Sequence, residues 1–153
     1  MEKFRSGFGE EYRHFDNLIW QGPSWCTAIF LGVLVASNQI AKDYATAWSV
    51  SDKIVLGLVL LVGFFFLLTC SYAVFRFRDH QTKVAPEGSY PKLGAQTLLQ
   101  LNVTAQSAIL LGLILHLVSR SIWIALGGFI LVLVVCMAYY EGEISKRRVA
   151  KKQ

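Results

Sequence analysis

Apolar residues follow one another without a charge from Ile54 to Phe75, between Lys53 and Arg76. As an α-helix this segment would extend about 33 Å, the thickness of the hydrocarbon core of a bilayer. A soluble domain rarely keeps so long a segment free of charge, so we predict a membrane-spanning helix over 54–75. Uncharged segments of similar length predict three further spans, over 18–41, 93–119 and 121–140. The predicted fold is all-α, a single polytopic membrane domain built as a four-transmembrane-helix bundle.

The segment before the first span is amphipathic. Its apolar residues recur at steps of three and four, on one face of a helix: Phe4, Phe8, Tyr12, Phe15 and Ile19. This pattern predicts an interfacial helix over 4–17, lying along the membrane surface. The alternative is a helix that packs on a soluble partner or on the protein's own loops. Gly22 and Pro23 predict a break between this helix and the span.

Small residues recur at every fourth position of the first span: Ser24, Ala28, Gly32 and Ala36. We call this set the small-residue ridge. Such a ridge lets another helix approach closely and therefore predicts a helix contact. The pattern leaves open whether that contact lies within the chain or between copies.

The span 93–119 has no formal charge but carries many polar side chains. Helical spacing places Gln96, Gln100 and Ser107 on one face with Thr104 beside them, while Gln106 belongs to another face. Because unpaired polar groups are costly in hydrocarbon, we predict that this helix faces protein or water. Two roles remain open. The face could line a pore or polar cavity between copies, or form a ladder of interhelical hydrogen bonds worth about 0.6–2 kcal/mol each.

Composition and charge agree with a membrane protein. Hydrophobic residues make up 54% of the chain and charged residues 16%, against about 25% charged in soluble domains. Twelve of the fifteen lysines and arginines lie in the amino-terminal segment, in the loop after the second span or in the tail. This bias predicts cytoplasmic termini in a plasma (inner) membrane. The loop 81–92, which contains Pro86 and Pro91, is predicted to be turns and coil.

The tail, 141–153, is basic. It is predicted to anchor on anionic lipid through five residues: Lys146, Arg147, Arg148, Lys151 and Lys152. We expect no nucleic-acid binding, because the net charge of +5 is explained by membrane topology.

The sequence contains no recognisable motif of catalysis or metal binding. Protease, hydrolase, nucleotide-binding and C-x-x-C motifs are missing, and no Asp or Glu lies inside a predicted span. We therefore predict no enzyme activity, no metal and no cofactor, and we expect the three cysteines to be packing residues.

These features favour a non-enzymatic, self-associating membrane protein that forms a pore or perturbs the bilayer as an effector. The alternative is an accessory subunit that docks on a larger membrane complex. A weaker alternative is an intramembrane enzyme of lipid chemistry. The expected partners are the lipid bilayer and either further copies of the chain or a partner membrane subunit.

Overall fold

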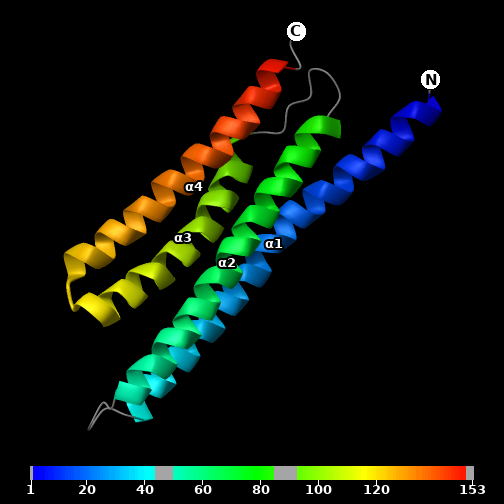
Figure 1. The fold of residues 1–153 in the computed structure, drawn as a ribbon. Coiled ribbons are helices and arrows are strands. Elements are labelled where there is room, and N and C mark those ends of the chain that lie inside the picture. The colour runs from blue at the N-terminus through cyan, green and yellow to red at the C-terminus, as the bar shows by residue number, and fades with distance from the viewer. Residues whose placement is uncertain (1, 44–49, 85–92, 151–153) are drawn as a thin grey trace.

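The computed structural model describes residues 2–43, 50–84 and 93–150 and folds them into four helices (Figure 1). These are α1 (Glu2–Asp43), α2 (Val50–Val84), α3 (Leu93–Ser119) and α4 (Ile122–Ala150). Each contains a segment long and apolar enough to cross a membrane: Tyr12–Lys42, Val50–Gln81, Ala95–Ser119 and Ile122–Lys146. The prediction of an all-helical protein with four potential spans is confirmed. The placement of these helices in a bilayer stays a prediction.

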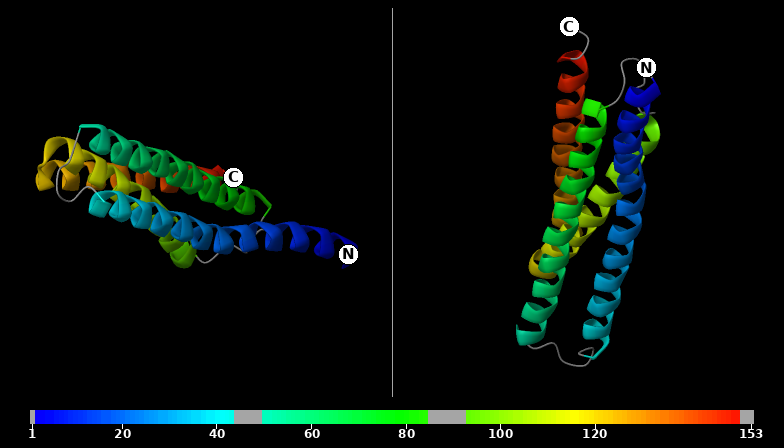
Figure 2. Two further views of the ribbon diagram at one scale, coloured as in Figure 1. Left: turned by 90° about the horizontal axis from the view of Figure 1, so that it is seen from below. Right: turned by 90° about the vertical axis from the view of Figure 1, so that its right-hand side faces the viewer.

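The helices run alternately up and down. The start of α1, the end of α2 and the end of α4 lie at one end of the molecule, which we call the terminal end, and the α3–α4 hairpin lies toward the opposite, hairpin end (Figure 1). α2 and α3 form the centre, and α3 crosses its neighbours obliquely (Figure 2). α1 packs on α2 and less extensively on α3, whereas α4 packs mainly on α3 and only slightly on α2. Among the described residues α1 and α4 do not touch, so the bundle is open.

α1 passes through Gly22 and Pro23 without interruption, so the break predicted there is wrong. Both residues lie where α1 packs inside the protein. Pro23 is buried, and a Cβ on Gly22 would lie 3.3 Å from Val74 Cγ2 of α2. The missing N–H of Pro23 removes one helical hydrogen bond, but packing on both sides of it keeps the helix continuous.

The first segment packs against α2 where its side chains are described. Ile19 is fully buried, and the ring centroid of Phe15 lies 5.0 Å from that of His80. These contacts match the alternative in which the apolar face packs on the protein itself. An interfacial position for 4–17 stays a prediction.

The apolar core lies where α1, α2 and α3 meet. Its buried members are Cys26, Leu56, Leu60, Phe64, Leu67, Val103 and Leu110. Gly63 allows this approach, since a Cβ there would lie 2.9 Å from Val33 Cγ2 and 3.0 Å from Leu110 Cδ1. Between α3 and α4 the chain reverses at Arg120, whose φ of 54° is left-handed and whose N–H donates to His116 O at 2.8 Å.

Two helices extend beyond the predicted spans at the terminal end. α2 continues to Val84, so the prediction of turns and coil is wrong for residues 81–84, and 85–92 lie outside the described residues. α4 continues through the basic tail to Ala150. These extensions bring charged side chains into contact with the bundle, where they form part of the site described next.

Candidate functional site

Polar side chains from all four helices meet inside the terminal half of the bundle, and we call this set the polar seam. Its members are Asp16 and Thr27 of α1, Ser71, Arg78 and Gln81 of α2, Gln96, Thr97, Gln100, Thr104 and Gln106 of α3, and Tyr140 and Glu141 of α4. From Gln96 to Gln106 the seam extends about 15 Å along α3. Toward the hairpin end it is followed by the apolar core.

The heptad-like spacing of α2 and α3 explains where the seam lies. Steps of four and three connect the buried residues Leu67, Ser71, Val74, Arg78 and Gln81 of α2. The same steps connect Gln96, Gln100, Val103, Ser107 and Leu110 of α3, which are also buried. A spacing of about 3.5 residues keeps one face of each helix toward its neighbour. Polar residues at these positions therefore have to pair with each other.

The middle of the seam joins α2, α3 and α4 around Ser71. Gln100 Nε2 donates to Ser71 O at 2.7 Å and to Ser71 Oγ at 3.0 Å. Ser71 Oγ also lies 2.8 Å from Thr104 Oγ1 and 3.4 Å from the Tyr140 hydroxyl. Gln100 Oε1 is buried and has no hydrogen-bond partner among the described residues.

A second group joins α1, α2 and α3 at the terminal end. Gln96 Nε2 donates to Gln81 Oε1 at 2.7 Å and to Asp16 Oδ1 at 3.4 Å. Gln81 Nε2 donates to the same carboxylate oxygen at 3.1 Å. Asp16 therefore accepts from two helices at once, a charge-assisted arrangement stronger than a pairing of neutral groups.

A third group joins α2, α3 and α4. Arg78 Nη2 donates to Glu141 Oε1 at 2.9 Å and to Thr97 Oγ1 at 3.1 Å, and Thr97 Oγ1 donates to Glu141 Oε1 at 3.3 Å. The Arg78 side chain is only 2% exposed, whereas that of Glu141 is 35% exposed. Neighbouring Asp79 is also buried, with Lys83 Nζ at 3.0 Å from its carboxylate. Buried charges require such partners because they have lost their hydration.

Gln106 connects α3 to α1. Its Nε2 donates to Thr27 Oγ1 at 2.7 Å, and Thr27 Oγ1 donates to Pro23 O at 2.8 Å. Gln106 lies six residues after Gln100 and therefore on a different face of α3, which is the face that packs on α1.

The four residues of the predicted polar face, Gln96, Gln100, Thr104 and Ser107, are all buried within one chain. Gln96, Gln100 and Thr104 bond to neighbouring helices. The Ser107 hydroxyl donates to Thr104 O of its own helix at 2.8 Å. This bond lies within α3, so Ser107 contributes a small buried side chain to the packing and not a bond between helices.

Sequence reasoning missed Ser71, Arg78, Gln81 and Glu141 as members of the site. Arg78 and Gln81 lie beyond the uncharged segment 54–75, so the apolar pattern does not include them. The signal that could have found them is the spacing of α2, since Arg78 and Gln81 continue the steps of four and three that begin inside the span.

The small-residue ridge faces away from the bundle. Ser24, Ala28, Gly32 and Ala36 are all exposed. A Cβ added to Gly32 would meet nothing within 4 Å, in contrast to Gly63 in the core. The ridge therefore makes no close helix contact within the described part of the chain.

The basic tail is described in part. Lys146 is exposed and lies 2.7 Å from Glu143. Arg147 and Arg148 belong to the last turns of α4, and Lys151 and Lys152 lie outside the described residues. Nothing in the structure tests lipid anchoring by these residues.

In the described ranges, no group of three or more His, Cys, Asp or Glu side chains is placed to hold a metal ion. The fold and the seam define the class of this chain, a helical protein with four potential membrane spans joined internally by polar side chains. No protein-family model, curated protein or solved structure matches it.

Proposed function

We propose that this chain is a non-enzymatic integral membrane protein that self-associates and acts as an effector by opening a polar path across the bilayer. In this proposal the terminal end is cytoplasmic, in a plasma (inner) membrane, and the structure corresponds to the closed state. The polar seam carries the proposal. Polar side chains inside membrane helices are costly, and they commonly mark pathways for ions or water.

The seam is closed by two features. Many of its polar groups bond to each other across the helices, which ties α1, α2, α3 and α4 together. Beyond Gln106 the interior is apolar, with Leu56, Leu60 and Leu110 buried between the helices. An apolar constriction of this kind excludes water and ions until it widens.

Opening requires helices to separate, and α4 has few contacts with any helix except α3. It does not touch α1 in the described part of the chain and touches α2 only slightly. Its polar links to α2 run from Tyr140 to Ser71 and from Glu141 to Arg78. Movement of the terminal end of α4 away from α2 would let water reach Ser71, Gln100 and Thr104.

Self-association is supported by the small-residue ridge. Association of helices in lipid depends on close van der Waals packing, which small residues permit. The ridge is exposed, and a Cβ added to Gly32 would meet nothing within 4 Å. A helix of another copy could therefore pack against the ridge.

Ion flux from vesicles tests the proposal. The purified chain is reconstituted in liposomes, and release of a trapped small ion is followed for wild type, Glu141→Gln and Glu143→Gln. Glu141→Gln removes the carboxylate that pairs with Arg78 and should raise flux. Glu143→Gln removes an exposed pair in the same helix and is the matched control. Retention of the trapped ion by vesicles with wild type and by vesicles with Glu141→Gln would contradict the proposal.

A second function, an accessory subunit of a larger membrane complex, is favoured by the same exposed ridge. A helix of a different protein could occupy it as readily as a helix of another copy. Size in mild detergent separates the two. A closed homo-oligomer supports self-association, and a monomer that enlarges only with a partner supports the subunit.

A further inference from the structure

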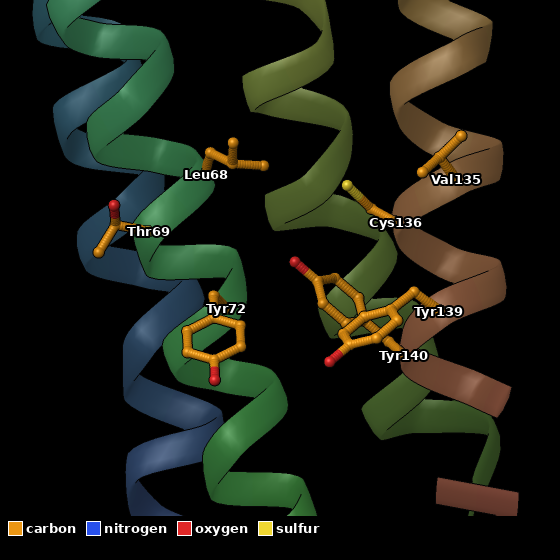
Figure 3. A pocket seen from close by; sticks show the side chains of 7 residues that line it. All are labelled: Leu68, Thr69, Tyr72, Val135, Cys136, Tyr139 and Tyr140. Atoms are coloured by element: carbon orange, nitrogen blue, oxygen red, sulfur yellow. The ribbon is translucent and has the colours of Figure 1, made fainter. Parts of the chain in front are cut away.

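A groove runs between α2 and α4 on the outside of the bundle, and its volume is about 400 Å³ (Figure 3). It arises because both helices pack on α3 but only slightly on each other. The lining residues are Leu68, Thr69 and Tyr72 of α2 and Val135, Cys136, Tyr139 and Tyr140 of α4.

The wall of the groove is largely apolar. The part of the groove nearest the terminal end of the bundle is lined by aromatic side chains. Phe75 lies beneath this end, with ring centroids 5.9 Å from Tyr72, 5.8 Å from Tyr139 and 5.0 Å from Tyr140. The Tyr140 hydroxyl is engaged with Ser71 inside the bundle. Tyr72 and Tyr139 are 46% and 55% exposed on the two sides of the groove.

The position of the groove indicates where its occupant comes from. Its residues belong to the last turns of the predicted spans 54–75 and 121–140, where tyrosines commonly mark the boundary between acyl chains and headgroups. An apolar surface at this depth is not filled by water. Acyl chains of the surrounding bilayer are the available occupant.

Basic residues continue the two sides of the groove toward the headgroup level. Thr69, Tyr72 and Arg76 follow at steps of three and four, so the exposed Arg76 lies one turn beyond Tyr72 on the same face of α2. On α4 the same steps lead from Tyr139 to Glu143 and Lys146, which pair with each other. Glu143 offsets the charge of Lys146, so of the described side chains that continue the two sides of the groove Arg76 carries the positive charge.

We infer that the α2–α4 groove binds an acyl chain of an anionic phospholipid, whose phosphate is held by Arg76. The lining covers only 68–72 of α2 and 135–140 of α4, which is about 6–8 Å of helix. That length suits part of an acyl chain below its headgroup and is short for a packed transmembrane helix. The inference rests on the proposed placement in a bilayer but not on conduction. The groove shares Tyr140 with the polar seam, since the ring lines the groove and the hydroxyl bonds to Ser71.

Photo-crosslinking in vesicles tests this inference. The full chain is reconstituted with phosphatidylglycerol or phosphatidylcholine that carries a diazirine in one acyl chain, at equal mole fraction, and the adducts are mapped by mass spectrometry. Adducts should concentrate on the groove-lining residues. Phosphatidylglycerol should give about fivefold more of them, which corresponds to one basic residue at the membrane surface.

Three variants sharpen the result. Arg76→Gln should remove the preference for phosphatidylglycerol and keep the position of the adducts, whereas Arg120→Gln at the hairpin end is the control and should change nothing. Thr69→Trp, at an exposed position of the groove, should reduce adducts from both lipids while leaving size in detergent unchanged. Adducts spread evenly around the lipid-facing surface, equal labelling by the two lipids, or a crosslink to a second copy in the groove would each overturn the inference.

Discussion

Arg78 of α2 and Glu141 of α4 form an ion pair at 2.9 Å between two helices whose other contacts are confined to a short segment around Phe75 and Tyr140. Arg78 is almost completely buried, so its charge depends on this partner and on Thr97. The pair joins α2 to α4 at the terminal end of the bundle. It also lies beyond the apolar part of α2, where its burial depends on the continuation of the helix to Val84.

Removal of this partner should destabilise the fold. Glu141→Gln should lower the free energy of unfolding by about 1.5–3 kcal/mol, the usual range for a hydrogen bond to a charged group. Glu143→Gln, which removes an exposed pair, should change it by less than about 1 kcal/mol. Thermal unfolding in one detergent measures both variants. Equal midpoints for the two would show that Arg78 does not depend on Glu141.

A larger side chain should have different effects at Gly63 and Gly32, on the stability of the fold and on the oligomer, respectively. Gly63→Ala places a Cβ against Val33 and Leu110 and should destabilise the fold by about 1–3 kcal/mol. Gly32→Leu meets nothing within the chain, so it should leave the melting temperature unchanged but reduce the oligomer seen by crosslinking and by size in detergent. An unchanged oligomer in Gly32→Leu would mean that the small-residue ridge faces lipid.

Cys26 and Cys70 should form a disulfide under a membrane-permeant oxidant. Cys70 packs against the apolar cluster that contains Cys26, across the contact of α1 with α2. With a protease site inserted in 44–49, the two fragments should stay joined on a non-reducing gel. Cys26→Ser should abolish the link, and Cys136→Ser should not. Fragments that separate in the oxidised wild type would contradict the packing of α1 on α2.

Membrane topology can be tested on a cysteine-free background. Single cysteines at Ser6, Thr82 and Lys152 should react with an impermeant reagent only from the cytoplasmic side, and a cysteine at Ser51 only from outside. The reason is the concentration of lysines and arginines at the terminal end. Labelling of the Thr82 position from outside would exclude the four-span topology.

The sequence was sufficient for the four helices and for the face of α3 that holds Gln96 and Gln100, because both depend on local periodicity. It was not sufficient to predict which residues of the other helices bond to that face. A polar stripe shows that a helix needs a partner, but the identity of the partner depends on packing between distant segments, as with Ser71 and Gln81. The break predicted at Pro23 failed for a related reason, since contacts with α2 outweigh the one hydrogen bond that proline removes.

Gln100 is the residue whose substitution best separates a structural role from a conducting one. Its Nε2 bonds to Ser71, while its Oε1 is buried without a described partner. Gln100→Leu removes both polar atoms and adds a side chain that the seam can pack. The lost bonds cost about 0.6–2 kcal/mol each, and the removal of the unpaired oxygen offsets part of that cost.

If the seam opens to conduct, Gln100→Leu should keep the oligomer and the fold, because the closed state becomes more apolar. It should bring ion flux down to the level of protein-free vesicles, even when combined with Glu141→Gln. The reason is that the opened path would lose the amide that binds its water. Flux and oligomer size are measured on the same preparation. Asn102→Leu is the control for loss of one amide from α3, because Asn102 is exposed and its side-chain bond within the described residues is the 3.3 Å contact of its Oδ1 with Gln106 Nε2. An oligomer that dissociates in Gln100→Leu but not in Asn102→Leu would assign the seam to interhelical hydrogen bonding alone, since loss of flux would then follow from loss of structure.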